Sequence, residues 1–172
     1  MIQLGILTDD DPVELLEGWL VYKMPKNPPH RVATKLTRDA LESVVPLGWY
    51  VDSQEPITLE DSEPEPDVVI VRGETRNYLD RHPTGQDIAL VIEVADSTLE
   101  RDRTSKQRLY ARAGIPIYWI INLSEQTIEV YTVPAIADQT YQQKNILSAS
   151  DQVQVVIEES AIAAFPVQSF LP

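Results

Sequence analysis

The chain has 172 residues, no cysteine and a formal net charge of −13, and 43% of its residues are hydrophobic. This composition fits one globular domain over residues 1–172, and it excludes disulfides and thiolate metal sites. The acidic charge argues against non-specific binding of nucleic acid, and no apolar run approaches the length of a membrane span. The N-terminus lacks the basic region and apolar core of a signal peptide, so we expect a cytoplasmic protein.

The N-terminal part of the chain predicts a hairpin and a helix. Residues 1–12 are interpreted as a loose arm. The following stretch, VELLEGWLVYKM, is apolar on both sides of a Glu-Gly pair, which favours a β-hairpin. Glu14 lies in its first strand, where a carboxylate ordinarily faces solvent. KNPPH is predicted as a loop because prolines break regular structure, and residues 30–45 show helical spacing. His30 begins that helix, a position more typical of a cap or surface group than of a ligand.

The middle of the chain predicts three short strands, at residues 48–51, 56–59 and 67–71. Asp67 opens the third strand directly after a proline. Residues 73–87 are predicted to form a polar loop. Later strands are predicted at residues 127–132, 141–147 and 153–157, with Ile162, Phe165 and Phe170 as packing anchors in the tail. We therefore expect a core over about residues 13–133, with C-terminal strands and a tail over 134–172.

Residues 87–122 predict a strand, a helix and a second strand, and the rest of the chain is organised around them. The first strand, residues 88–94, is apolar except for Glu93, which must be paired, protonated or bound to a metal ion. Ser97 and Glu100 match a capping box at the start of the helix, and Gly114 matches its end. The second strand, residues 117–121, should pair in parallel with the first and antiparallel with residues 127–132.

Helical spacing predicts which side chains of that helix lie on the same face. The apolar stripe contains Leu109, Tyr110 and Ala113, and Lys106 lies beside it, with Asp102 one turn earlier. The helix therefore aims one lysine toward the sheet, near the end of the strand that carries Glu93. The outer face carries arginines that could meet phosphates, namely Arg101, Arg108 and Arg112.

Asp67, Glu93 and Lys106 can meet in one pocket if their two strands are neighbours. Two carboxylates suit a hard divalent ion such as Mg²⁺, and a lysine beside them could orient or deprotonate a water or stabilise charge on a phosphate. This combination is typical of a site that cleaves phosphodiesters. The residues leave a second interpretation open, in which Glu93 and Lys106 form a structural salt bridge and Asp67 caps its strand.

The order of these residues resembles the signature of the PD-(D/E)xK nuclease superfamily. More closely, it is similar to a family of restriction endonucleases long known only as a domain of unknown function. The matching positions cover roughly residues 13–133 and are Glu14, Gly18, His30, Pro66, Asp67, Glu93, Val94, Ser97, Thr98, Asp102, Lys106, Tyr110, Gly114, Tyr118 and Trp119. The superfamily lysine normally follows the glutamate by two residues, where this chain has Ala95, so Lys106 must supply the amine from the helix. Asp96 and Ile117 also differ from the residues common in the family.

The resemblance implies an α/β (α+β) fold with a restriction-endonuclease-like mixed sheet flanked by helices and an N-terminal β-hairpin. It implies that Asp67, Glu93 and the carbonyl of Val94 hold Mg²⁺ or Mn²⁺ while Lys106 positions the attacking water, for hydrolysis of DNA. Glu14 would add a carboxylate, and the same pocket would include His30, Asp102 and Tyr110. A homodimer is permitted by the resemblance. The alternatives are a catalytically inactive, nucleic-acid-binding or accessory member and a hydrolase of smaller phosphate esters.

Overall fold

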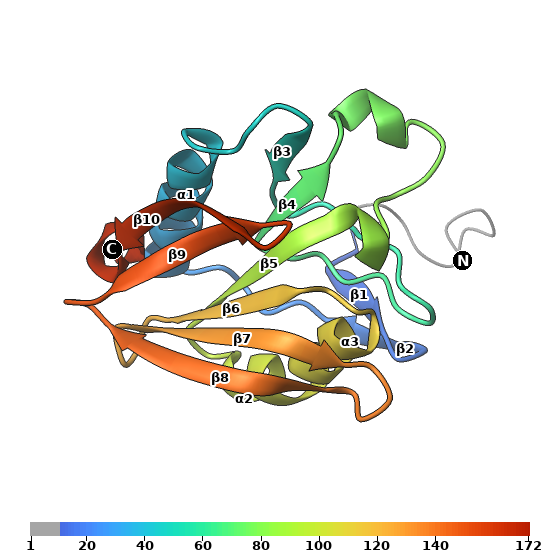
Figure 1. Cartoon of the computed structure of the whole chain (residues 1–172). Helices are drawn as coiled ribbons and strands as arrows, with labels where there is room; N and C mark the ends of the chain where they lie inside the picture. Colours follow the sequence, from blue (N-terminus) through green and yellow to red (C-terminus); the bar gives the residue numbers. More distant parts are fainter. Residues whose placement is uncertain (1–10) are drawn as a thin grey trace.

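A computed structural model describes residues 11–172, and its centre is a six-stranded mixed sheet covered on both faces (Figure 1). The predicted fold class is confirmed. Of the predicted N-terminal arm, residues 1–10 lie outside the described residues. Within residues 11–172, none of the helices has the length and apolar character that a membrane crossing requires.

Only one pair of neighbouring strands in the sheet is parallel. The strands, in spatial order, are β3 (Trp49–Asp52), β4 (Val68–Arg72), β5 (Ile88–Ala95), β6 (Ile117–Asn122), β7 (Thr127–Ala135) and β8 (Thr140–Ser148). The parallel pair is β5 and β6, joined by a helical connection as predicted, and every other pair is antiparallel. All residues of β5 and β6 are buried, which explains their unbroken apolar runs.

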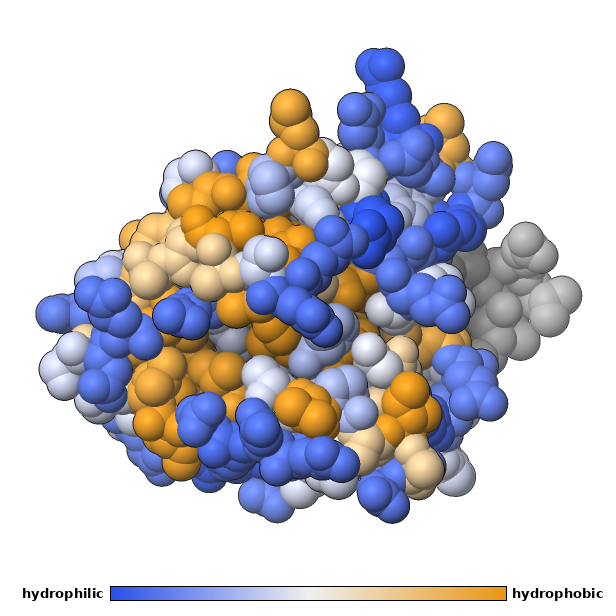
Figure 2. Space-filling view, viewed as in Figure 1, coloured by the Kyte–Doolittle hydropathy of each residue, from blue (hydrophilic) through white to orange (hydrophobic). Residues whose placement is uncertain are grey.

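Different elements cover the two faces of the sheet (Figure 1). The first face packs against α1 (Pro28–Glu42), the hairpin of β9 (Gln152–Ile157) and β10 (Ser160–Pro166), and η5 (Val167–Phe170). The second face packs against the β1 (Val13–Leu16) and β2 (Trp19–Tyr22) hairpin and the helical segment of α2 (Leu99–Arg101), η4 (Asp102–Lys106) and α3 (Gln107–Arg112). From Leu90 onward, the side chains of β5 alternate between these two cores, after a register irregularity against β4 at the start of the strand. Figure 2 shows that apolar side chains on the viewed face gather over β9 and β10.

Two predictions in the first half of the chain are wrong. Pro28 and Pro29 are not loop residues but the first residues of α1, where a missing N–H costs nothing. Asn27 caps this helix, because its side-chain oxygen accepts a hydrogen bond from the His30 N–H at 3.0 Å. Residues 56–59 form no strand and make only a single bridge through Thr58. The predicted polar loop at residues 73–87 contains two short 3-10 helices, η2 (Thr75–Tyr78) and η3 (Gly85–Asp87).

The helix after β5 also differs from its prediction. The capping box of Ser97 and Glu100 is absent, and Thr98 stands at the N-cap, its hydroxyl donating to an Asp102 carboxylate oxygen at 2.6 Å. The helix then passes through a π turn, in which the Gln107 N–H donates to the Asp102 carbonyl five residues earlier. At the other end of the chain, β10 is a strand where the sequence predicted only packing anchors.

We predict that Trp119→Ala lowers the free energy of unfolding by about 3–5 kcal/mol, because the Trp119 side chain is fully buried on β6 against Phe170. Urea unfolding measures the loss. Leu47→Ala is the control, since Leu47 is fully exposed and should change stability by no more than about 0.5 kcal/mol. A loss for Trp119→Ala as small as that of the control would contradict this packing.

Candidate active site

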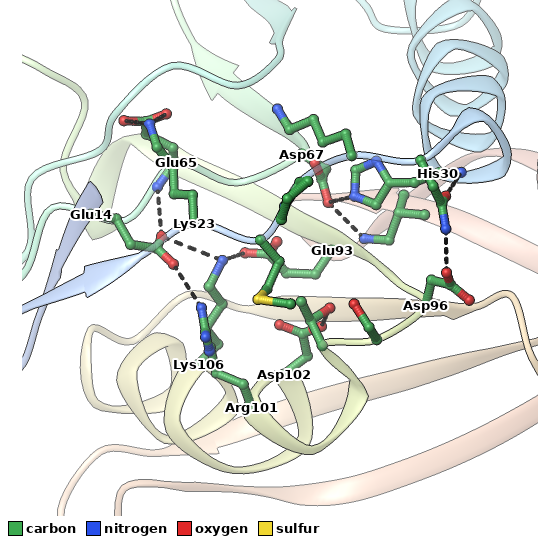
Figure 3. Close-up of a pocket in the computed structure, with 17 residues that line it drawn as sticks. Glu14, Lys23, His30, Glu65, Asp67, Glu93, Asp96, Arg101, Asp102 and Lys106 are labelled. Carbon is green, nitrogen blue, oxygen red and sulfur yellow. Dashed lines mark hydrogen bonds and ion pairs between the residues drawn. The ribbon is translucent and has the colours of Figure 1, made fainter. Parts of the chain in front are cut away.

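Asp67 is held in place by groups from two neighbouring elements. The register of β4 and β5 sets Val68 opposite Ile92, which brings the preceding Asp67 beside Glu93. One Asp67 oxygen, Oδ2, accepts a hydrogen bond from the Val94 N–H at 2.9 Å and contacts His30 Nε2 at 3.0 Å (Figure 3). The end of the sheet and the first turn of α1 therefore orient this carboxylate together.

Glu93 points from β5 toward the helical segment of η4 and α3. Its Oε1 accepts hydrogen bonds from Lys106 Nζ at 2.9 Å and from the Tyr110 hydroxyl at 2.6 Å. Lys106 therefore reaches Glu93, a contact that both the catalytic and the structural interpretation of the sequence require (Figure 3). Asp102 and Lys106 are the two buried residues of the π turn, and both line the pocket that contains Glu93.

Glu14 is buried, and the ordinary expectation of a solvent-facing carboxylate is wrong for it. Its Oε2 lies 3.6 Å from Lys106 Nζ, and its Oε1 lies 3.7 Å from Arg101 Nη1. Lys106 therefore lies between carboxylates from two elements, because Glu93 contacts it from β5 and Glu14 contacts it from β1.

The outer arginines of the helical segment hold the hairpin in place, and Arg101 also lines the pocket. Arg101 donates to the Tyr22 carbonyl at 3.4 Å, and Arg108 Nε donates to Glu17 at 3.0 Å. Arg112 pairs with the carboxylate of Asp61, and the Asp61 carbonyl accepts a hydrogen bond from the Gly18 N–H in the turn of the hairpin. These contacts keep Glu14 over the pocket. The sequence showed no partner for the arginines, since each acid is far away in the chain.

Burial and charge perturb the carboxyl groups in opposite directions. Burial alone would raise the pKa of Asp67, but the hydrogen bond and charge of His30 hold it below its ordinary value. Burial raises the pKa of Glu93; Lys106 opposes this effect, and the nearby carboxylates of Asp67 and Asp102 add to it. Burial also raises the pKa of Asp102. The pocket thus crowds several acids around one buried ammonium group.

That ammonium group belongs to Lys106. Burial alone would lower the pKa of Lys106, but the carboxylates of Glu93, Glu14 and Asp102 raise it above its ordinary value. The raised pKa favours the ammonium form of Lys106 at neutral pH, which can donate hydrogen bonds to a water or to an anionic oxygen.

The pocket is a cavity of about 80 Å³ that is lined by every predicted site residue except Tyr110. Tyr110 lies behind the lining and donates a hydrogen bond to Glu93. Its remaining wall includes residues that sequence reasoning missed, in the segment between β2 and α1 and just before β4: Lys23, Met24, Pro25, Lys26, Asn27 and Glu65. The only available signal was their nearness in sequence to His30 and Asp67.

The donor groups suit an oxygen-ligated cation. The hydrogen bonds described above use Asp67 Oδ2 and Glu93 Oε1. The second oxygen of each carboxylate, Asp67 Oδ1 and Glu93 Oε2, makes no hydrogen bond within residues 11–172. Val94, the residue with the predicted carbonyl ligand, lines the same pocket. No group of three or more histidine or acidic side chains in the described part of the chain is arranged to hold a metal ion. Main-chain oxygen and water would therefore have to complete the coordination, as is usual for Mg²⁺.

Comparison with known proteins identifies the family. The model of the Uma2 family, described as "Putative restriction endonuclease", matches residues 2–164, and the chain belongs to this family. A solved structure from Anabaena variabilis ATCC 29413, described as a "putative nuclease belonging to DUF820", has the same fold. It superposes with a TM-score of 0.74 at 18% sequence identity, over 98% of this chain and 94% of that one. No curated protein matches the chain significantly.

We predict that Lys106→Met lowers the free energy of unfolding by about 3–5 kcal/mol at about pH 8, because it leaves buried carboxylates without a counter-charge. The loss should be smaller at about pH 5. The pKa of Glu93 is raised in the folded chain, so the folded state takes up a proton before the unfolded state as the pH falls. A neutral Glu93 carboxyl needs no counter-charge, so the loss of Lys106 destabilises the folded state less at the lower pH.

Urea unfolding at the two pH values tests this prediction. Lys35→Met is the matched control, since it removes an exposed ion pair with Asp39 and should cost at most about 0.5 kcal/mol at either pH. Equal losses for Lys106→Met at both pH values would show that the buried charges are not the cause.

Proposed function

We propose that this protein is a metal-dependent endonuclease that hydrolyses phosphodiester bonds of DNA. The observation that carries the proposal is the meeting of Asp67, Glu93 and Lys106 in one pocket, with a free oxygen on each carboxylate. Membership of the restriction endonuclease family supports the same activity. Location in the cytoplasm and assembly as a homodimer remain predictions from the sequence.

Asp67, Glu93 and the Val94 carbonyl would hold Mg²⁺ or Mn²⁺. When bound there, the cation supplies a water of lowered pKa and neutralises charge on the phosphate. Lys106 stays protonated and donates an N–H to the attacking water or to a phosphate oxygen. The attacking water loses a proton to solvent as its oxygen bonds to phosphorus, one P–O ester bond breaks, and the leaving oxygen takes a proton from solvent, which gives a phosphate monoester and an alcohol.

The other pocket residues act on these three groups. His30 fixes the orientation of Asp67, and the Tyr110 hydroxyl fixes that of Glu93. Glu14 holds the Lys106 ammonium from the side opposite β5 and keeps it charged. Asp102 adds to the negative potential that favours a cation.

One observation favours a second candidate, a nuclease-fold protein that binds nucleic acid without cleaving it. Lys106 and Tyr110 both donate to Glu93 Oε1, so this oxygen is satisfied without any cation. In that case the pair of Glu93 and Lys106 would stabilise the fold alone.

We predict that Asp67→Ala and Glu93→Gln each lower Mg²⁺-dependent cleavage of plasmid DNA by at least about 10³-fold, because each removes a carboxylate from the cation site. Gel assays of purified protein with Mg²⁺, Mn²⁺ or a chelator measure the rate. Glu159→Gln is the control, since Glu159 is an exposed acid in the turn between β9 and β10. Cleavage that survives Asp67→Ala would contradict the proposal, and single-stranded DNA and nucleotide phosphate esters should be run beside the plasmid to define the substrate.

We predict that calorimetry detects binding of Mn²⁺ at millimolar concentration or below, and that Asp67→Ala abolishes it. This experiment separates the two candidates, because a cation site is needed only for cleavage. Absence of binding by the intact protein would favour the non-catalytic candidate, even if nucleic acid binds.

A further inference from the structure

A second cavity lies along the outer face of α1, and we call it the α1 groove. Its volume is about 470 Å³, and its charged lining residues are all basic: Lys26, Arg31, Lys35 and Arg38. No acidic side chain of residues 11–172 lines it. This wall contrasts with the chain as a whole, whose formal net charge of −13 would repel a polyanion.

The α1 groove adjoins the candidate active site. Lys26 lines both cavities. In the wall of the groove, the Thr34 hydroxyl donates to the His30 carbonyl at 2.9 Å, and His30 reaches Asp67 from the first turn of α1 (Figure 3). The hydroxyl of another groove residue, Ser53, donates to the Asp67 carbonyl at 2.7 Å. A chain-like molecule in the groove would therefore continue past Lys26 into the pocket.

Two of the four cations in the groove have no counter-charge. Lys26 and Arg31 are exposed and form no ion pair with the residues that the structure describes. Lys35 and Arg38 each pair with an acid four residues along α1, and Arg38 also lies in the field of Asp52. Exposed pairs of this kind are weak in water, so an anion can compete for them. We therefore expect Lys26 and Arg31 to contribute most to the binding of an anion.

The spread of the cations fits a strand with repeated charges better than one small anion. Arg31, Lys35 and Arg38 follow each other at helical spacings of four and three residues, so they occupy one side of α1 over about 10 Å. This length equals about three nucleotides of a B-DNA strand, at about 3.4 Å each. Val32 and Leu36, which also line the groove and are exposed, offer apolar surface to the sugar rings between phosphates.

We propose that the α1 groove binds the phosphate backbone of the DNA strand whose scissile phosphate lies in the pocket, with Lys26 and Arg31 as the main contacts. This inference rests on the proposed function, because it names the surface that guides the substrate of the same site. Contacts with phosphates carry no direct sequence information, so the groove positions the strand without selecting its bases.

Fluorescence anisotropy of a labelled DNA duplex, measured in a chelator over a range of salt concentrations, tests the proposal without any cleavage. Lys26→Ala and Arg31→Ala should each weaken binding about three- to tenfold and reduce the slope of log K against log salt by about 0.9, because each removes one phosphate contact. Lys35→Ala should lose less, since Lys35 already has an acidic partner.

Arg76→Ala is the matched control, because it removes the same charge from a place outside both cavities. Arg76 is exposed in η2, beyond the end of β4 that lies away from Asp67, and it forms no ion pair within residues 11–172. This variant should bind the duplex like the natural chain and leave the salt slope unchanged.

Three results would overturn the inference: no binding of the duplex by the natural chain, Lys26→Ala and Arg31→Ala variants that bind like Arg76→Ala, or polyglutamate that binds the groove more tightly than the duplex does. The last result would assign the groove to an acidic protein. The failure of the proposed function looks different. In that case the duplex still binds through Lys26 and Arg31, but the natural chain does not cleave it in Mg²⁺ or Mn²⁺.

Discussion

The contact between the ammonium group of Lys106 and the carboxylates around it is the interaction on which the site depends. Glu93 reaches it from the centre of the sheet at 2.9 Å, and Glu14 reaches it from the hairpin at 3.6 Å. An uncompensated buried charge costs several kcal/mol, so neither acid could stay ionised in this pocket without the amine. Lys106 thus joins the sheet, the helical segment and the hairpin through charge.

The π turn and the arginine contacts explain how three separate elements meet at one amine. The π turn buries Asp102 and Lys106 together, and the Tyr118 hydroxyl from β6 donates to the Asp102 carbonyl at 3.1 Å. On the outer side, Arg108 and Arg112 attach the hairpin and its neighbouring loop to the same helical segment. The position of Glu14 therefore depends on how the hairpin, its neighbouring loop and the helical segment pack together.

Much of the fold could be predicted because its local signals agree with its packing. The apolar run of β5, interrupted only by Glu93, predicted a strand covered on both faces, and that strand is fully buried. Helical spacing placed Lys106 beside the apolar stripe and toward the sheet, but its contact with Glu93 is visible only in the structure. The π turn could not be predicted, because it depends on a contact between distant parts of the chain. The Tyr118 hydroxyl of β6 donates a hydrogen bond to the Asp102 carbonyl in this turn.

Other features depend on contacts between residues far apart in the chain. Glu14 on an ordinary amphipathic strand looks solvent-facing, and only the helical segment that packs over it makes it buried. The prolines of KNPPH look like loop residues, although the side chain of Asn27 turns them into the start of a helix. Likewise, the hairpin partners of Arg101 and Arg108 could not be predicted, because they lie far away in the chain.

The contact between His30 and Asp67 has a consequence for the protein during its synthesis. It joins residues 37 positions apart, and Asp67 also needs the Val94 N–H, 27 positions further along the chain. Lys106 comes later still, so a chain leaving the ribosome has no complete pocket until β5 and the helical segment have emerged and packed. Under the proposed function, a partly made chain would therefore be unable to cleave nucleic acid.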